Sequence, residues 1–304
     1  MPKRLALIFA MLLTASVIVA CGRERVQTPT AVPSRAITPT VTLTALPPSP
    51  TAVPMAAVVN GTPIPLSEFQ AEEARARAAA ATLGTEIAPN PSQIAKTVLA
   101  DMVDTALLAQ AAYASGYKPS KDEELWKQAV SEAGGEQALQ AFLRKNGYTR
   151  QAFLRSLRKQ RAAAWMARRI AAQVPRSAEQ VRLRQILVYN QKDAEAVLAR
   201  LKHGEDFAKL AWQYDPYTGG DLGWAPRGYL LQPAVEKAAF SLKVGEVSGI
   251  IKTPLGYHII KVEDRAVRPL DPLALQVLQH KALEDWLRRQ RANASIRIFV
   301  TPMP

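Results

Sequence analysis

Two glycine-containing segments hold the side chains of this chain that are best placed to do chemistry. The first is Gly219-Gly220-Asp221-Leu222-Gly223-Trp224, and the second is Thr253-Pro254-Leu255-Gly256-Tyr257-His258-Ile259-Ile260-Lys261. A third segment, Gln185-Ile186-Leu187-Val188, precedes both of them. Glutamine can donate and accept hydrogen bonds, but it cannot titrate or change tautomer as an imidazole does.

The sequence gives no sign of metal, cofactor or covalent chemistry. The histidines at 203, 258 and 280 are scattered and Cys21 is the only cysteine, so no set of side chains has metal-ligand spacing. The chain has no glycine-rich phosphate loop after a strand, no HExxH pair and no GxSxG turn. His203 lies before Gly204 at the expected end of a helix, and His280 lies on an expected C-terminal helix. We therefore expect no cofactor and no metal.

The order and spacing of the three segments resemble the parvulin family of peptidyl-prolyl cis/trans isomerases. The similarity extends from about Val181 to Arg265 and includes Ala238-Ala239-Phe240 and Val244-Gly245-Glu246-Val247-Ser248. It implies a four-stranded antiparallel sheet with surrounding helices, and an activity at peptide bonds that precede proline. Rotation about such a bond faces a barrier of about 18–20 kcal/mol because amide resonance must be broken, although no covalent bond forms or breaks. Catalysis then needs an apolar pocket for the proline ring and polar groups that favour the twisted amide.

The resemblance also implies a set of polar site residues. Parvulins typically carry two histidines on adjacent strands, with an acid or cysteine near the substrate carbonyl and a threonine nearby. His258 matches the second histidine, Thr253 the threonine and Asp215 the acid, while Gln185 occupies the place of the first histidine. The loop from Tyr214 to Gly219 is a few residues shorter than the usual loop of the family. These two departures concern the activity and leave the expected fold unchanged.

Apolar side chains of this region match the parvulin proline pocket. They are Leu222, Leu230 or Leu231, Val235 and Phe240. In a sheet domain of this size the same side chains could instead be ordinary core.

The N-terminal residues predict export. Two basic residues precede an apolar run from Leu5 to Ala20, which is too short to span a membrane comfortably and has the layout of a secretion signal. Small residues before Cys21 resemble a bacterial lipoprotein signal, which implies a signal peptide at 1–20 and a lipidated Cys21. A buried free thiol or an uncleaved anchor are the alternatives. Residues 21–56 are rich in proline and threonine and predict a disordered tether or a glycosylated stalk.

Residues 57–178 predict a helical domain that the chain enters through a strand. A strand and turn are expected at Val58–Ile64 around Asn60-Gly61, because β-branched residues flank a turn-forming pair. Helices are then expected at 67–83, at 92–115, from 120 onward and at 149–174, with Ser67, Ser120 and Thr149 as their starting signals.

The C-terminal residues 267–304 follow the expected isomerase domain at 179–266. They predict a helix from Pro272 to about Asn293 and a strand at 296–300. The whole arrangement resembles the SurA and PrsA group of extracytoplasmic chaperone-foldases, in which the final segment completes the helical domain. We therefore expect an α+β protein in which the C-terminal strand pairs with the strand at about 57–60, since an isolated strand needs a partner.

Charge is unevenly distributed along the chain, whose formal net charge is +13. Residues 185–265 hold equal numbers of basic and acidic side chains, whereas the expected helix at 149–174 holds basic residues and no acid. Such a helix could bind nucleic acid, anionic lipid or acidic clients, although export argues against nucleic acid. The simpler interpretation is a solvated face, with Phe153, Leu157 and Trp165 turned toward the core.

Two classes of function remain open from the sequence. The first is a membrane-tethered isomerase and chaperone that acts on unfolded secreted polypeptides at their X-Pro bonds. The second is a holdase, in which the parvulin fold binds extended proline-containing chain and catalyses little.

Overall fold

The computed structural model of the protein describes residues 53–81 and 90–300. The expected signal peptide at 1–20, Cys21 and most of the expected tether lie outside these residues. Contacts divide the described residues into two compact units. One contains 53–56, 64–81, 90–99 and 299–300, and the other contains 57–63 and 100–298. No helix of the described ranges has both the length and the apolar character that crossing a membrane requires.

A small sheet joins segments that are far apart in the sequence. Strands β1 (Met55–Val59) and β2 (Thr62–Pro65) are connected by Asn60-Gly61, whose φ angles of 49° and 79° are those of a two-residue hairpin turn. Strand β7 (Ile296–Ile298) pairs antiparallel with β1, and the strand order is β2-β1-β7. The expected pairing of the C-terminal strand with residues near 57–60 is therefore confirmed.

Most of the helices precede the second sheet. They are α2 (Leu66–Ala81), α3 (Pro91–Ala114), α4 (Asp122–Glu132), α5 (Glu136–Lys145) and α6 (Arg150–Ala171). The starting signals expected at Ser67 and Ser120 were wrong, because α2 begins at Leu66 and α4 follows Lys121 with no side-chain cap. Helix α5 was not expected as a separate element. It is separated from α4 by Gly134 and Gly135, whose positive φ angles end the preceding helix.

Helix α6 forms part of two apolar clusters. It begins as expected after Thr149, whose hydroxyl accepts a hydrogen bond from the Ala152 N–H. Phe153 and Leu157 are buried with residues of α4 and α5, and Trp165 packs against a second cluster of α3 and α6 residues. The C-terminal helix α10 (Pro272–Asn293) contributes Leu283, Trp286 and Leu287 to this second cluster, so α10 packs on α6.

Three of the basic side chains of α6 contact acidic or aromatic residues of the neighbouring helix α4. Arg158 forms an ion pair with Asp122, and Arg161 lies 3.0 Å from Glu132. The Arg150 guanidinium lies 4.3 Å from the centroid of the Trp126 ring, in cation–π geometry. These contacts favour the interpretation of α6 as a solvated helix face over that of a surface kept free for an acidic partner.

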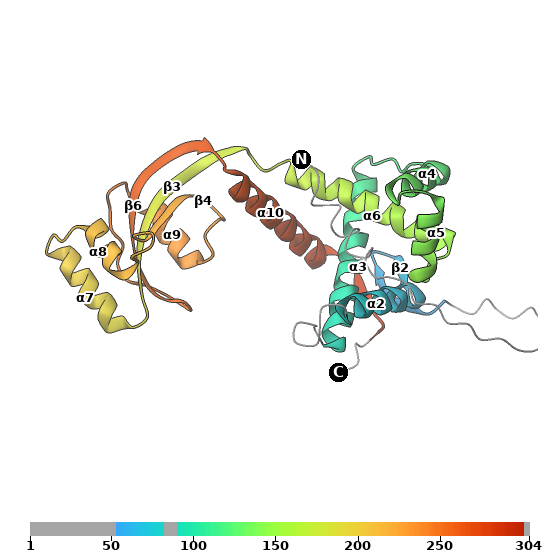
Figure 1. The fold of residues 1–304 in the computed structure, drawn as a ribbon, viewed down its shortest axis with the longest axis horizontal. Coiled ribbons are helices and arrows are strands. Elements are labelled where there is room, and N and C mark those ends of the chain that lie inside the picture. Colours follow the sequence, from blue (N-terminus) through green and yellow to red (C-terminus); the bar gives the residue numbers. More distant parts are fainter. Residues whose placement is uncertain (1–52, 82–89, 301–304) are drawn as a thin grey trace, which may run out of the picture. The chain divides into compact units, whose positions relative to one another are not determined.

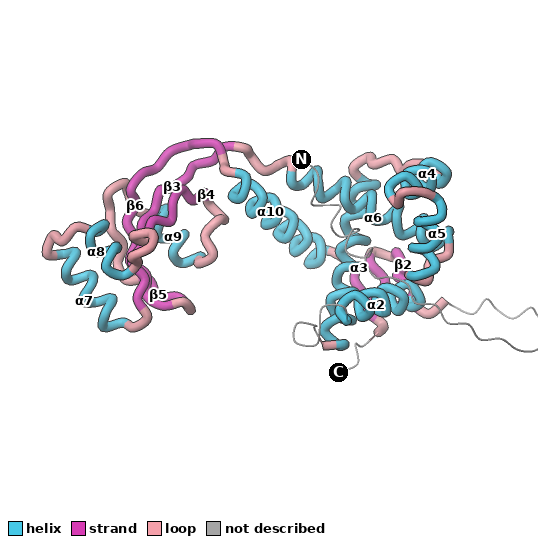
Figure 2. Tube along the Cα trace, viewed as in Figure 1, coloured by secondary structure: helices cyan, strands magenta, loops and turns pink. Residues whose placement is uncertain are grey.

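The second sheet is four-stranded and antiparallel, as expected for a parvulin-like domain. Its strands are β3 (Ser177–Val188), β4 (Asp221–Pro226), β5 (Ile251–Thr253) and β6 (Gly256–Pro269), in the order β4-β3-β6-β5. The long central pair β3 and β6 runs side by side in Figure 2, and its register extends from Ser177 opposite Pro269 to Val188 opposite Tyr257. The sheet therefore continues past the domain boundaries expected at 178/179 and 266/267, because its outermost residues stay paired.

Helices cover both faces of this sheet. Helices α7 (Gln191–Lys202) and α8 (Phe207–Tyr214) lie on one side of it, and α9 (Pro233–Ser241) lies on the other (Figure 1). Ile186, Val188 and Ile259 belong to the core beneath α7 and α8. Val181, Leu183, Ala225, Ile260 and Val262 belong to the core beneath α9. Because strand side chains alternate between faces, Gln185 and His258 lie on the α9 face.

Candidate active site

The two central strands bring Gln185 and His258 together. In the β3–β6 register Gln185 pairs with Ile260 and Leu187 with His258, so the two polar side chains are diagonal neighbours on one face. Strand β5 pairs with the beginning of β6, and the turn between them places Thr253 beside His258. Each polar side chain thus comes from a different strand of the sheet.

These three side chains form a directed chain of hydrogen bonds. His258 Nδ1 lies 3.1 Å from Gln185 Oε1, and His258 Nε2 lies 2.8 Å from Thr253 Oγ1. A carboxamide oxygen only accepts, so Nδ1 carries the proton and the Thr253 hydroxyl donates to Nε2. The Gln185 Nε2 group has no hydrogen-bond partner among the described residues, so it remains available as a donor.

His258 is buried and its environment favours the neutral imidazole. Its exposed fraction is 3%, and burial lowers the pKa of His258 from its ordinary value because the charged form loses its hydration. Both ring nitrogens nevertheless have partners, which removes the energetic penalty of an unsatisfied buried polar group. At neutral pH the three side chains are therefore uncharged, and each atom of the network keeps its role as hydrogen-bond donor or acceptor.

Asp215 occupies the loop between α8 and β4. Its Oδ1 accepts from the N–H groups of Tyr217 and Thr218 at 3.0 and 3.1 Å, and its Oδ2 accepts from the Gly220 N–H at 3.2 Å and from the Thr218 hydroxyl. These bonds, with the Thr218 hydroxyl first, lower the pKa of Asp215 to about 2. The structure thus brings Gln185, Thr253 and His258 together, and it joins Asp215 to its own loop.

The apolar site positions differ in their exposure. Val235 and Phe240 are buried in the core beneath α9, and Leu222 and Leu230 are partly buried against that core. Leu231 is 90% exposed, so the structure distinguishes it from its neighbour Leu230. The guanidinium of Arg227 lies 4.0 Å from the centroid of the Phe240 ring. Of the expected pocket residues, Leu222 and Leu230 are therefore the ones placed between the core and solvent.

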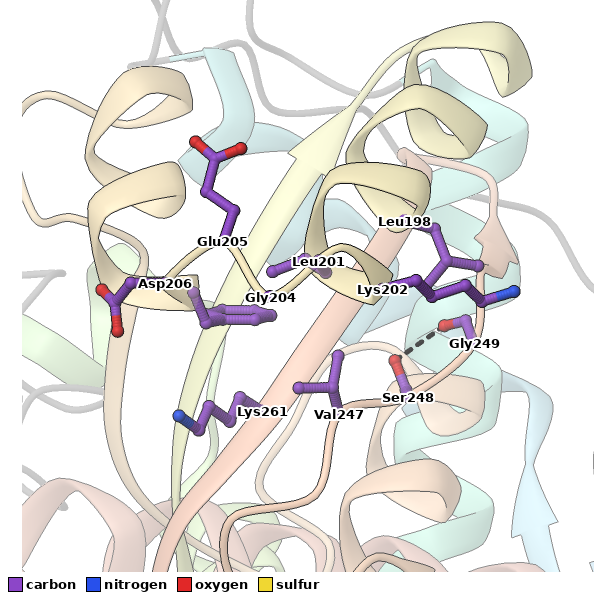
Figure 3. Close-up of a pocket in the computed structure, with 11 residues that line it drawn as sticks. Leu198, Leu201, Lys202, Gly204, Glu205, Asp206, Val247, Ser248, Gly249 and Lys261 are labelled. Carbon is purple, nitrogen blue, oxygen red and sulfur yellow. Dashed lines mark hydrogen bonds between the residues drawn. The ribbon is translucent and has the colours of Figure 1, made fainter.

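A cavity of about 560 Å³ lies on the other face of the sheet. Figure 3 shows the loop Gly204–Asp206 facing the segment Val247–Gly249 across this cavity, with Lys261 of β6 at its edge. Lys261 follows Ile260 along β6, so its side chain points to the face opposite His258. The cavity is therefore separate from the hydrogen-bonded network, and no motif of the sequence indicated it.

The sequence analysis also missed Arg184. Its guanidinium donates to the Gly219 carbonyl oxygen over 2.7 Å and to Glu263 over 2.6 Å. The only signal for it in the sequence is an arginine directly before Gln185. Among residues 53–81 and 90–300, no cluster of His, Cys, Asp and Glu side chains could hold a metal ion.

Comparisons with known proteins agree with this geometry. Residues 184–264 match the model of the PPIC-type PPIase domain, and residues 50–157 match that of the SurA-like N-terminal domain. The foldase protein PrsA of Caldanaerobacter subterraneus is 44% identical over 126 residues, which are 40% of this chain and 39% of the foldase. The chaperone SurA of Alkalilimnicola ehrlichii is 39% identical over 119 residues, which are 34% of this chain and 27% of the chaperone.

Among solved structures, a crystal structure of the peptidylprolyl isomerase PrsA from Bacillus anthracis is similar to this chain. It has a TM-score of 0.43 and 23% identity, and the match covers 67% of this chain and 99% of that chain. The chain spans less than half the length of either of the two curated relatives named above. Residues 184–264, which match the PPIC-type model, include the whole hydrogen-bonded network. Residues 184–264 therefore form a parvulin domain of the PPIC type, and it follows a SurA-like N-terminal domain.

Proposed function

We propose that this protein is a peptidyl-prolyl cis/trans isomerase and chaperone that assists the folding of exported polypeptides. The observation that carries the proposal is the network of Gln185, His258 and Thr253, which is set at the edge of an apolar cluster in a PPIC-type domain. Relatives named foldase and chaperone support the same activity. Its proposed partners are unfolded or partly folded secreted chains that contain X-Pro bonds.

The proposed mechanism relies on differential stabilisation of the twisted amide. As the peptide bond rotates, its nitrogen lone pair leaves resonance and becomes able to accept a hydrogen bond. The free Gln185 Nε2 group is proposed to supply this bond, since His258 fixes the orientation of its carboxamide. A donor that is already oriented requires no reorganisation when the transition state forms. Leu222 and Leu230 are proposed to contact the proline ring, with Val235 and Phe240 behind them.

The enzymatic part of the proposal is tested by a proline-peptide isomerisation assay. The wild-type chain should accelerate isomerisation, and His258→Ala should lower the rate while retaining peptide binding. His203→Ala provides a matched control, because His203 directly follows α7 and lies outside the network. The enzyme proposal fails if the wild-type protein binds the peptide yet accelerates its isomerisation no more than His258→Ala does.

A holdase is the second candidate, and the presence of Gln185 favours it. A carboxamide can take over the hydrogen bonding of the missing family histidine, but it cannot take over any titration. Aggregation suppression should be measured beside isomerisation for His258→Ala, Asp215→Ala and Leu230→Ala. Full suppression in all three variants would assign chaperoning mainly to the helical domain, whereas a parallel loss of both activities would assign it to the parvulin domain.

We also propose that the protein is exported and attached to the membrane through a lipid on Cys21. The support is the sequence of the first residues, where an apolar run ends in small residues directly before this cysteine. Mass spectrometry of the mature N-terminus should find a lipid-modified Cys21 in the membrane fraction. Cys21→Ser should release the protein or leave it unprocessed, and an unchanged N-terminal mass and fractionation in that variant would contradict the anchor.

A further inference from the structure

The turn Gly219-Gly220 lies directly against the backbone of Gln185. The Gln185 N–H donates to the Gly220 carbonyl oxygen over 2.8 Å. Gly220 has a φ of +70°, and a Cβ atom added to it would lie 2.0 Å from the Gln185 carbonyl oxygen. No side chain fits at this contact, so a displacement of the turn would displace Gln185 as well.

One charged side chain holds this turn from the sheet. Arg184 donates from Nη1 to the Gly219 carbonyl oxygen over 2.7 Å and from Nε to Glu263 of β6 over 2.6 Å. Its side chain is only 14% exposed, so these hydrogen bonds are partly shielded from water. Arg184 thus ties the turn to the strand that carries His258.

A second charged side chain holds the turn from the loop. The Asp215 carboxylate accepts from the Gly220 N–H, and its remaining hydrogen bonds are to Tyr217 and Thr218. No hydrogen bond joins Asp215 to His258 or Thr253 in the described part of the chain. With its pKa lowered to about 2, Asp215 stays ionised at neutral pH and does not exchange a proton there.

A glutamine in this place has a particular need for such support. Its side chain has more rotatable bonds than that of histidine, so more conformational freedom must be removed before the carboxamide is correctly oriented. His258 fixes only the oxygen of the carboxamide. The Gln185 backbone is held on one side by its pairing with Ile260 of β6 and on the other by the Gly219-Gly220 turn, so the turn is the part of its support that lies outside the central strand pair.

We propose that Arg184 and Asp215 are positioning residues, which hold the Gly219-Gly220 turn so that Gln185 keeps its hydrogen bond to His258 and presents its Nε2 group to substrate. The role in catalysis rests on the proposed isomerase function. The role in placing Gln185 does not depend on it.

The test uses two variants of the full chain. Arg184→Met removes both hydrogen bonds and keeps an unbranched side chain of similar length, and Asp215→Asn replaces one of the two carboxylate oxygens that accept within the loop by an NH2 donor, with little change of shape. Matched controls are Arg200→Met, which breaks the Arg200–Glu205 pair of the other face, and Asp206→Asn, which retains a good cap for α8. NMR spectra should follow the Gln185 side-chain amide and the His258 ring nitrogens, and isomerisation assays should give kcat and KM.

We expect both variants, and neither control, to shift the Gln185 amide and His258 nitrogen signals. Their kcat should fall about tenfold with KM changed less, because a displaced donor affects the transition state more than binding. Unshifted signals in folded Arg184→Met and Asp215→Asn would overturn the proposal. If Arg184→Met does not fold, Asp215→Asn alone decides. If the wild-type chain shows no isomerisation and the signals still shift, the isomerase function fails while the positioning role stands.

Discussion

The two faces of the four-stranded sheet are built from the same strands but differ in what they bury. The core beneath α7 and α8 contains Ile186 and Ile259 among aliphatic and aromatic side chains. The face beneath α9 has a comparable apolar cluster, but it also buries His258 at 3% exposure and joins it to Gln185 and Thr253. A buried polar side chain lowers stability unless its hydrogen bonds are made, so the His258 network requires accurate positioning in addition to close packing.

The largest effect is expected from a cavity-forming substitution on the face beneath α7 and α8. Ile259→Ala should lower the free energy of unfolding by about 3 kcal/mol, because Ile259 is fully buried and its removal leaves a cavity. Urea unfolding would measure this, with Ile259→Val as the milder control at about 1 kcal/mol. The kcat/KM of the remaining folded protein should stay within about twofold. A loss of activity larger than the loss of folded protein would mean that the two faces are not separate in function.

His258→Ala tests the opposite face. Its kcat/KM should fall at least about tenfold, which corresponds to about 1.4 kcal/mol of transition-state stabilisation, while stability falls less than in Ile259→Ala. Stopped-flow isomerisation and urea unfolding on the same samples would make the comparison. A large stability loss at unchanged activity would reassign His258 to the core.

Substitutions at two neighbouring leucines test which of them belongs to the peptide-binding site. Leu230 packs against the cluster beneath α9, whereas Leu231 is 90% exposed. Leu230→Ala should raise the KM for a proline peptide several-fold by shrinking the contact with the ring, and Leu231→Ala should leave it nearly unchanged. Equal changes in KM for the two substitutions would show that the difference in exposure between Leu230 and Leu231 has no effect on peptide binding.

Acid should affect the polar face through His258. Its folded-state pKa lies below the ordinary value of 6.5, so between these two values the unfolded chain binds a proton that the folded chain does not. Stability should therefore be constant above neutral pH and decrease as the pH falls through 6.5. Melting temperatures at about pH 5.5 and 7.5 should show a larger difference for wild type than for His258→Ala. An equal difference in both proteins would remove His258 as the cause.

The smallest expected effect is that of Gln185→His. An imidazole can supply the hydrogen bonds of the carboxamide, and His258 remains its neighbour. We expect kcat/KM to be preserved or raised by about two- to threefold. A decrease of tenfold or more in a folded variant would indicate that the network is specific to glutamine.

The sequence predicts some parts of this molecule better than others. Linked motifs from Gln185 to Lys261 indicate the sheet and the place of His258, because such motifs fix both order and spacing. The loop role of Asp215 could not be predicted, since it depends on which backbone N–H groups a short turn presents to one carboxylate. Arg184 lay outside every motif, and its contact with Gly219 depends on tertiary structure. Helix α5 was missed because no capping side chain marks its start, its N-cap residue being Gly135.

The pairing of β7 with β1 has a consequence for the order in which the chain can fold. The Ser295 N–H donates to Asn60 across a separation of 235 residues, and the parvulin domain lies wholly within that interval. Contacts of such long range form late, because the closure of a large loop must precede them. Until the C-terminal strand pairs, the strand at residues 55–59 therefore has an unpaired edge on the β7 side, while the inserted domain can already be folded. A protein proposed to assist the folding of others thus passes through an incomplete stage of its own, with an open sheet edge.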